Sequence, residues 1–588
     1  MMKNLQHSRR RLRIDIVLAV TLLYSVCFYF VVNMDTIMGS SFADEVKQDI
    51  ALLKDKTREA KDRLIEGSQL KKDGNTKQEK SNERSSTPAT TSVSSSSDEE
   101  QAKETVRRRQ SIVRMTRSAW RAYMAAAAGH DEVMPWSNAS SDRWGGIGVT
   151  PIDAMDTLLL MGLIDEFEEA AALSLKIDLG KSTKELSVFE TIIRHLGASL
   201  TIFTATNNAA FLQLGTSIMD GLMHAFDTPL GMPMHTTTFN GSPQDAKPWY
   251  TGNVLLAECG SNQLEMRYLA HLTRNTMYAD VSNRFTEFLL SRLENGWPFN
   301  GSMYEKNAPF IRHKGLWGTF INPKSGKFSG AAGFHSLMDS TYEYLLKQWI
   351  LFGKEDDEML GLYEDAIEGF LVHLLRYMPN TNYAVIGYQG FGYFPVMDHL
   401  VCFTPGMLIL GVMHGAHSQP GRKRSWDTED VVTAAVDLLA TCYRLYAESP
   451  TGIGPEIVEF EEDGHYTVRD PKYILRPETI ESIFYMYRYT HDEKYREWGW
   501  KIAQAIQSTC RTPNGAFSSL YHVEHGGETS NKMDKMESFF FAETLKYLYL
   551  LFTEDDILPL DRFVLTTEAH PLPVLKSHPW NKRRPSTS

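Results

Sequence analysis

The feature that most constrains the fold is a long succession of apolar residues at helical spacing, which runs from about residue 112 to about residue 575. One such stripe lies within residues 189–203 and another within residues 539–550. Long segments that alternate apolar and polar residues, as half-buried strands do, are scarce. The sequence therefore predicts a helical domain over residues 112–575.

A short motif recurs inside this domain. The pattern T-x-[DN]-x-x-[YF] occurs at residues 206–211, 273–278 and 490–495, each time between two expected helices. Its Asx residue can cap the second helix, and its aromatic ring can pack back on the first. The spacing indicates a repeat of about 67–72 residues, which makes roughly six or seven helical hairpins. We favour their closure into an α/α barrel, with an open solenoid as the alternative.

The segment before this domain predicts a membrane anchor. Residues 14–32 are apolar apart from Asp15, basic residues precede them, and no Lys or Arg follows until Lys47. This length meets the lower limit for a spanning helix, and the charge bias keeps the amino terminus in the cytosol. A cleavable signal peptide is the alternative. We expect a cytosolic tail over residues 1–13, a signal-anchor helix over 14–32, a partly disordered luminal stem over 33–111 and a C-terminal tail over 576–588.

Charge and cysteine content exclude some classes of function. The chain has 61 Lys and Arg against 73 Asp and Glu, and its folded part has no basic stripe, which argues against nucleic acid as a partner. Five cysteines without a C-x-x-C pair exclude a disulfide scaffold and a cysteine metal cluster. Sequons at Asn138, Asn240 and Asn300 support a luminal location, although weakly.

Several carboxylates stand where a helix should be apolar. Glu543 falls on the stripe of residues 539–550, so it is buried with a partner or faces a polar cavity. Glu190 precedes Arg194 by four residues, which an exposed ion pair would also explain. Glu478 follows Pro477, where the helix dipole alone favours an acid.

Three further acidic positions are ambiguous. Asp339 precedes Ser340 and Glu343, which form a capping-box pattern. Glu456 lies in a Gly/Pro turn, and the pair 398–399 (Asp-His) suits either a satisfied core pair or a ligand pair. Such residues can nevertheless converge at one end of a helical ring, and paired carboxylates are the apparatus of glycoside hydrolysis.

Eight motifs identify a family resemblance. They are FETIIR at 189–194, DSTYEYLLK at 339–347, MDHLVCF at 397–403, GPEIV at 454–458, LRPETIES at 475–482, DKMESFF at 534–540, ETLKY at 543–547 and TTEAHP at 566–571. In this order they resemble the class I α-mannosidases, glycoside hydrolase family 47. Within that family the chain is most similar to the endoplasmic-reticulum and Golgi mannosyl-oligosaccharide 1,2-α-mannosidases.

The resemblance implies a fold and a reaction. The fold would be an (α/α)7 barrel, and the activity would be a calcium-dependent, inverting exo-α-1,2-mannosidase that trims high-mannose N-glycans of glycoproteins. Glu190 would be the general acid, acting through a water, with Asp339 as the other candidate. Glu478 would be the base, and Glu456 ranks last among the possible proton donors.

The resemblance also implies binding residues. Thr567 would bind Ca²⁺ through its carbonyl and hydroxyl oxygens, since calcium prefers hard oxygen ligands. Cys402 and Cys442 would form a disulfide, while Cys259 and Cys510 are unassigned. The residues expected around the terminal mannose are Arg194, Asp398, His399, Arg476, Glu481, Phe539, Glu543 and Glu568.

One position departs from the endoplasmic-reticulum pattern. Leu337 stands where those enzymes resemble one another in carrying arginine and where Golgi members have leucine. Leucine cannot replace the charged hydrogen bonds with which arginine would hold one glycan branch. The sequence therefore leaves branch preference open, along with the choice between endoplasmic-reticulum and Golgi membrane. It also leaves the oligomeric state open.

A second class of function remains as an alternative. A mannose-binding, lectin-like factor in glycoprotein quality control would use the same pocket without chemistry. That function predicts a lost acid or base, whereas all the proposed acids and Thr567 are present. An α/α-barrel glucosidase or endoglycanase would lack the TTE sequence at 566–568 in this setting.

Overall fold

The computed structural model describes residues 94–249, 252–295, 315–390, 392–418 and 424–576. Residues 103–202 and 209–576 group in one compact unit, and residues 94–102 and 203–208 group apart from it. The predicted cytosolic tail, the anchor, residues 33–93 of the stem, residues 577–588 and Asn300 lie outside the described residues. None of the helices in the described ranges is long and apolar enough to cross a membrane.

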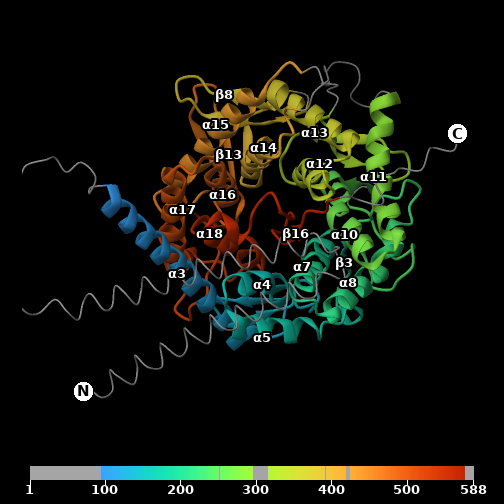
Figure 1. Ribbon diagram of the computed structural model, residues 1–588, viewed down its shortest axis with the longest axis horizontal. Helices are drawn as coiled ribbons and strands as arrows, with labels where there is room; N and C mark the ends of the chain where they lie inside the picture. The colour runs from blue at the N-terminus through green and yellow to red at the C-terminus, as the bar shows by residue number, and fades with distance from the viewer. Residues whose placement is uncertain (1–93, 250–251, 296–314, 391, 419–423, 577–588) are drawn as a thin grey trace, which may run out of the picture. The chain divides into compact units, whose positions relative to one another are not determined.

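Helices dominate the described chain (Figure 1). Their bounds are α3 (Ser94–Ala127), α4 (Val149–Leu160), α5 (Ile164–Ser174), α6 (Val188–Glu190), α7 (Gly197–Thr206), α8 (Ala209–Leu222), α9 (Leu256–Gly260), α10 (Gln263–Thr273), α11 (Thr276–Asn295), α12 (Asp339–Leu351), α13 (Asp357–Gly369), α14 (Thr404–Met413), α15 (Thr428–Ala447), α16 (Glu478–Thr490), α17 (Glu493–Ala505) and α18 (Lys546–Leu551).

Within the larger unit, helices form an inner layer and an outer layer. The inner layer runs through α4, the π-helical turn η2 (Thr191–Leu196), α10, α12, α14, α16 and the segment made of η9 (Phe540–Leu545) and α18, each in contact with the next. Because η9 also contacts α4, the series closes on itself. Helices α5, α8, α11, α13, α15 and α17 pack against their inner neighbours, and Trp120 of α3 packs edge-on against Phe541 of η9. This closure agrees with the predicted α/α barrel and not with an open solenoid.

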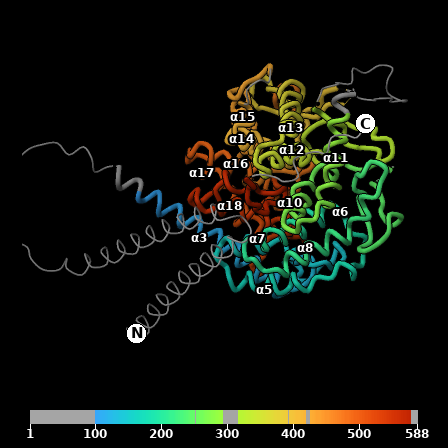
Figure 2. The backbone as a smooth tube through the Cα atoms, turned by 45° about the vertical axis from the view of Figure 1, so that its right-hand side comes forward, coloured from blue at the N-terminus to red at the C-terminus, as the bar shows by residue number. Residues whose placement is uncertain are grey.

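A turned view supports the same order. Helices α12 and α14 remain side by side, as do α16 and α18 (Figure 2). The interior is apolar and aromatic, with Trp120, Trp317, Trp349 and Tyr485 fully buried. Burial of such large side chains is the main term that stabilises the closed ring.

The recurring motif is a helix–helix turn of one geometry. In the copy at 273–278, Arg274 has a positive φ of 59°, and the Asn275 side chain accepts a hydrogen bond from the Met277 amide at 3.2 Å. In the copy at 490–495, His491 has φ 52° and Asp492 caps α17. Tyr278 and Tyr495 are both 1% exposed. The left-handed residue ends one helix and the Asx side chain starts the next, as the motif predicts.

Short antiparallel strands connect the helices, so the fold is not purely helical. The sheet with the most strands has five, in the order β11-β10-β7-β6-β5, and a second sheet has three, in the order β12-β13-β14. The strands have five residues or fewer, which is too short for an alternating pattern to show in the sequence. Their bounds are β1 (Glu132–Met134), β2 (Ala139–Ser141), β3 (Leu186–Ser187), β4 (Thr236–Thr237), β5 (Val254–Leu255), β6 (Gly318–Ile321), β7 (Phe328–Ala332), β8 (Leu375–Tyr377), β9 (Ala384–Ile386), β10 (Tyr388–Gln389), β11 (Tyr393–Phe394), β12 (Val396–Asp398), β13 (Ile457–Phe460), β14 (Tyr466–Asp470), β15 (Phe563–Leu565) and β16 (Pro571–Pro573).

The expected boundary between stem and domain lies within a helix. Helix α3 begins at Ser94, so the predicted boundary at residue 112 falls inside a continuous helix. Arg108 pairs with Glu497, and Arg109 pairs with Glu554, which ties this part of α3 to the domain. The Glu, Gln, Lys and Arg residues before residue 112 are strong helix formers, and their low apolar content hid the helix from the periodicity argument.

Candidate active site

A cavity of about 560 Å³ gathers residues that are up to 425 positions apart in the sequence. The predicted residues that line it come from inner helices and from the turns that lead into them. Their positions at the cavity show that the motifs of the sequence converge, as expected of a catalytic pocket at one site in a helical ring. These lining residues are Glu190, Arg194, Leu337, Asp339, Arg476, Glu478, Glu481, Phe539, Glu543, Thr567 and Glu568.

Glu478 is the first residue of α16 and its side chain is 14% exposed. His399 Nδ1 lies 2.8 Å from Glu478 Oε2, and Arg476 lies 3.8 Å from the other carboxylate oxygen. Burial would raise the pKa of Glu478, but the hydrogen bond with His399 and the charge of Arg476 bring this pKa below its usual value. The Glu478 carboxylate is therefore held ionised, as a base must be.

Asp339 begins α12 and has the opposite environment. Its Oδ1 accepts a hydrogen bond from the Ser340 amide at 2.9 Å. Burial, together with the nearby carboxylates of Asp398 and Glu343, raises the pKa of Asp339 to about 8. A carboxyl group that keeps its proton at neutral pH has the property of a general acid.

Glu190 and Arg194 form the predicted ion pair, with Arg194 Nε 2.8 Å from Glu190 Oε2. The pair is not the exposed one that the sequence alone also allowed, because the Arg194 side chain is 8% exposed. Arg194 also donates to Asp153 at 3.1 Å and to Glu568. Burial opposes the charge of Arg194, but these carboxylates raise its pKa well above the usual value. Arg194 thus fixes Glu190 at the cavity wall.

The capping-box interpretation of residues 340–343 is wrong. Helix α12 begins at Asp339, and Met338, which has no capping side chain, occupies the N-cap position. Glu343 instead lines the cavity and pairs with the buried Lys347. Because the helix starts two residues earlier than the capping box requires, Glu343 is an inward-facing acid and not part of a cap.

The cavity is lined by more carboxyl groups than lysine and arginine residues. Burial raises the pKa of Glu481 to about 8, and the carboxylates of Glu343 and Glu478 add to this rise although Lys347 opposes it. Burial and the carboxylates of Glu568 and Glu478 raise the pKa of Glu543 well above its usual value. Such an excess of buried carboxylate suits a hard cation with oxygen ligands.

Thr567 offers the cavity a hydroxyl and a backbone carbonyl from a turn. It lies between β15 and β16, and its amide donates to the Tyr344 hydroxyl at 3.1 Å. No group of three or more His, Cys, Asp or Glu side chains within the described ranges is arranged to hold a metal directly. A cation at Thr567 could take these two oxygens as ligands, with water and substrate oxygens completing its shell.

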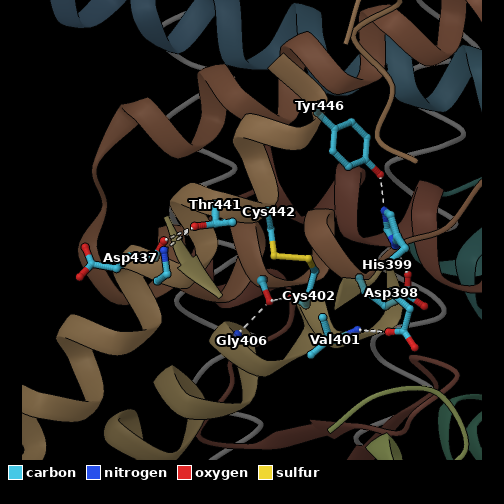
Figure 3. Close-up of a disulfide and its surroundings, with 12 residues drawn as sticks. Asp398, His399, Val401, Cys402, Gly406, Asp437, Thr441, Cys442 and Tyr446 are labelled. Atoms are coloured by element: carbon cyan, nitrogen blue, oxygen red, sulfur yellow. Dashed lines mark hydrogen bonds and ion pairs between the residues drawn. A yellow bond between two sulfur atoms is a disulfide. The ribbon is translucent and has the colours of Figure 1, made fainter. Parts of the chain in front are cut away.

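Three predicted site residues lie behind the residues that line the cavity. Asp398 accepts hydrogen bonds from the Ser336 and Val401 amides at 2.9 and 3.1 Å. His399 joins Glu478 to the Tyr446 hydroxyl, which is 2.6 Å from its Nε2 (Figure 3). Glu456 accepts both of its hydrogen bonds from Arg476 Nε, at 2.9 and 3.0 Å. Each of these residues supports one that lines the cavity.

Two π-helical turns place site residues in the inner layer. Turn η2 carries Arg194, and turn η9 carries Glu543. A π-turn inserts one extra residue and rotates the side chains that follow, and such turns are common at functional sites. No sequence signal marks them.

Left-handed backbone occurs beside the site at residues other than glycine. Leu337 has φ 73°, Leu475 has φ 67° and Ala569 has φ 57°. Each carbonyl is held from another element: Leu337 by the Ala257 amide, Leu475 by the Thr544 hydroxyl and Ala569 by Lys546. This strain costs about 1–2 kcal/mol per residue and persists only where the surroundings enforce it.

Part of the cavity wall consists of residues that were not predicted as site residues. Arg143 stacks on Trp144 at 4.9 Å and pairs with Glu132 and Glu537. Arg143 and Trp144 lie in a turn, where helical periodicity gives no signal. Charged and aromatic lining residues that were not predicted as site residues include Arg143, Trp144, His235, Trp249, Glu258, Glu343 and Glu537.

The predicted disulfide is present. Cys402 in the turn before α14 joins Cys442 of α15 (Figure 3). Cys259 and Cys510 are free and buried. The bond fixes the segment that carries Asp398 and His399 to an outer helix.

Comparisons with known proteins identify the family. A model of glycosyl hydrolase family 47 matches residues 115–574. The human endoplasmic reticulum mannosyl-oligosaccharide 1,2-alpha-mannosidase is 38% identical over 479 residues, which are 79% of this chain and 64% of that protein. The chain thus spans slightly less than two thirds of the human relative's length.

Two further proteins agree with this match. The Drosophila melanogaster mannosyl-oligosaccharide alpha-1,2-mannosidase IA is 34% identical over 490 residues, with 82% of this chain and 69% of that protein covered. The solved alpha-1,2-mannosidase from Trichoderma reesei superposes with a TM-score of 0.69 and 29% identity, covering 79% of this chain and 99% of that one. The chain belongs to glycosyl hydrolase family 47.

Proposed function

We propose that this chain hydrolyses terminal α-1,2-linked mannose from high-mannose N-glycans, with inversion at the anomeric carbon. The names of its relatives support the reaction class. The observation that carries the proposal is the pair of opposed carboxyl groups at one cavity: the pKa of Glu478 is lowered, whereas that of Asp339 is raised to about 8. Environments that separate two such groups define an acid and a base.

In this mechanism Glu478 takes a proton from a water molecule, and the water oxygen attacks the anomeric carbon. The bond from that carbon to the glycosidic oxygen breaks, and the leaving oxygen receives a proton from the acid. The released sugar is then β-mannose. An inverting site needs carboxyl groups about 6.5–9.5 Å apart, to leave room for the water.

We assign the proton donor to Asp339. Its raised pKa keeps a proton available, whereas Glu190 is ion-paired with Arg194 and is better suited to orient a water between itself and the leaving oxygen. The Glu456 carboxylate accepts hydrogen bonds from Arg476 and does not line the cavity. This favours a role in holding Arg476 over a role as proton donor.

We also propose that calcium is the cofactor, bound through the carbonyl and hydroxyl oxygens of Thr567. The excess of buried carboxylate around Glu481 and Glu543 supports this choice. When bound, the ion would orient the hydroxyl groups of the terminal mannose and favour its distorted ring.

Leu337 affects which branch of the high-mannose glycan the enzyme trims. It lines the cavity with 38% of its surface exposed and offers no hydrogen-bond donor there. We therefore expect progressive removal of all α-1,2 mannoses, which suits a Golgi-type enzyme. A single dominant product lacking one mannose would instead support endoplasmic-reticulum trimming.

The location is proposed from the sequence and the relatives. A type II anchor over residues 14–32 would place the domain in the lumen of the endoplasmic reticulum or Golgi, and the relatives include a protein named for the endoplasmic reticulum. Asn138 and Asn240 are exposed, as glycan acceptors must be. Protease protection of the full chain in sealed microsomes tests this topology.

The activity itself is tested with high-mannose N-glycan in the presence and absence of EDTA, and products are separated by mass and branch isomer. Calcium-dependent mannose release supports the proposal. Tight glycan binding without release would favour the lectin-like alternative.

A further inference from the structure

The turn that presents Thr567 is held by several hydrogen bonds, some within the turn and some from buried side chains. It joins β15 to β16, which lies in the middle of the ring of helices (Figure 1). Within the turn, the Thr566 amide donates to the His570 carbonyl at 3.0 Å, and the Ala569 amide donates to the Thr566 carbonyl at 2.9 Å. Ala569 has left-handed backbone, which alanine adopts only when its surroundings enforce it.

Buried polar side chains contact the turn at the Thr567 amide and at the Ala569 carbonyl. The Tyr344 hydroxyl accepts the Thr567 amide at 3.1 Å and donates to Glu265 at 2.7 Å. Lys546 Nζ donates to the Ala569 carbonyl at 2.7 Å and to Asp156 at 2.7 Å. Tyr344 and Lys546 are both 0% exposed.

A third buried group approaches the same turn more loosely. Lys347 Nζ lies 3.5 Å from the Thr566 carbonyl and pairs with Glu343. Two buried lysines that both donate to one four-residue turn are unusual, because burying an ammonium group is costly unless it is paired and hydrogen-bonded. Packing alone does not require them, since apolar residues of the same volume would fill the space.

We propose that Tyr344 and Lys546 are positioning residues of the calcium site: Tyr344 holds the peptide that precedes Thr567, Lys546 holds the Ala569 carbonyl two residues later, and together they aim the Thr567 carbonyl and hydroxyl oxygens at the ion. This inference rests on the proposed function, which places calcium at Thr567. Groups that orient metal ligands in this way commonly change metal affinity about 10–100-fold when removed.

The chain supplies a matched control. Tyr342 lies on the same helix, is also 0% exposed, and its hydroxyl also accepts a backbone amide, that of Trp317 at 3.1 Å. The amide that it binds is far from the turn in sequence, and Tyr342 does not line the cavity. Tyr342→Phe and Tyr344→Phe therefore remove the same atom from equally buried positions, but only the second touches the turn.

The experiment titrates calcium chloride into the metal-free full chain of wild type, Tyr344→Phe and Tyr342→Phe, and follows binding by calorimetry and by the rise in Tm. We expect Tyr344→Phe to bind calcium about 10–100-fold more weakly, with mannose release restored at saturating calcium. Tyr342→Phe should bind as wild type does. Lys546→Met provides a second variant and should weaken calcium binding in the same direction.

The outcomes separate this inference from the proposed function. If wild type binds calcium and the two tyrosine variants share its affinity, the positioning role is wrong and the proposed function stands. A loss of metal-free Tm that is equal in both variants, with unchanged calcium affinity, leads to the same conclusion. If wild type binds no calcium, the cofactor assignment and this inference both fail.

Discussion

The carboxyl groups of Glu478 and Asp339 differ in what surrounds them. His399 and Arg476 face Glu478, whereas Asp398 and Glu343 lie near Asp339. If Glu478 activates the attacking water, Glu478→Gln removes the base while keeping the shape of the side chain. We expect kcat to fall about 10²–10⁴-fold, with glycan binding retained. Mannose release and glycan affinity are measured on the same preparation, and near-normal release would contradict the assignment.

The same two groups predict the pH dependence of kcat/KM. Activity requires ionised Glu478, whose pKa is lowered, so the acid limb should fall at a pH below the usual glutamate range. Activity also requires protonated Asp339, whose pKa is raised to about 8, so kcat/KM should decline as the pH rises through about 8. In Asp339→Asn the small residual activity should lack this alkaline limb. An unchanged limb near pH 8 in that variant would assign the proton donor to another residue.

Residue identities at the site were predictable where a motif carried them. Glu190, Asp339, Glu478 and Thr567 belong to long sequence motifs, and all of them line the cavity. Arg143, by contrast, reaches the cavity from a turn whose shape depends on contacts with Glu132 and Glu537, which a local pattern cannot show.

At the scale of elements, the helix–helix turn makes a stability prediction. Asn275 caps α11 through the Met277 amide. Asn275→Ala should lower the free energy of unfolding by about 1 kcal/mol, whereas Asn275→Asp keeps an acceptor and should change it little. Denaturant unfolding of the three proteins measures the difference. Equal stability of the Ala and Asp variants would show that the cap contributes nothing.

Element boundaries were the weakest part of the sequence argument. Glu343 fits a capping box in the sequence, but the helix starts two residues earlier than that box requires, and Glu343 lines the cavity. The π-turn η9, which carries Glu543, depends on tertiary contacts that outweigh the local preference for an α-helix or a strand. The same holds for the short strands, which have five residues or fewer. The helical hairpins were predictable because their apolar stripes and Asx caps are local.

At the scale of the whole molecule, the disulfide closes a long loop. Cys402 and Cys442 are 40 residues apart. The chain-entropy model gives about 4 kcal/mol for a loop of this length, because the bond restricts the unfolded chain. Cys402→Ala with Cys442→Ala should lower the free energy of unfolding by about that amount under oxidising conditions. Reduction of wild type should give a similar loss, and no difference between the oxidised proteins would refute the estimate.

The sequence favoured a closed ring of helices without requiring it. In the structure, η9 contacts α4 and closes the ring. The repeat length allowed either a ring or a solenoid, and only the packing of η9 on α4 decides between them. Such a contact joins residues near opposite ends of the domain, and no local signal encodes it. Within the closed ring, Arg194 pairs with Glu568, which is 374 residues away in the sequence.

The central claim is inverting hydrolysis of α-1,2-linked mannose with calcium bound at Thr567. Time-resolved proton NMR of the full chain with an α-1,2-linked mannose substrate, with and without EDTA, tests it most directly. We predict that β-mannose appears first and only while calcium is present. Release of α-mannose first, or release that EDTA does not stop, would contradict the account.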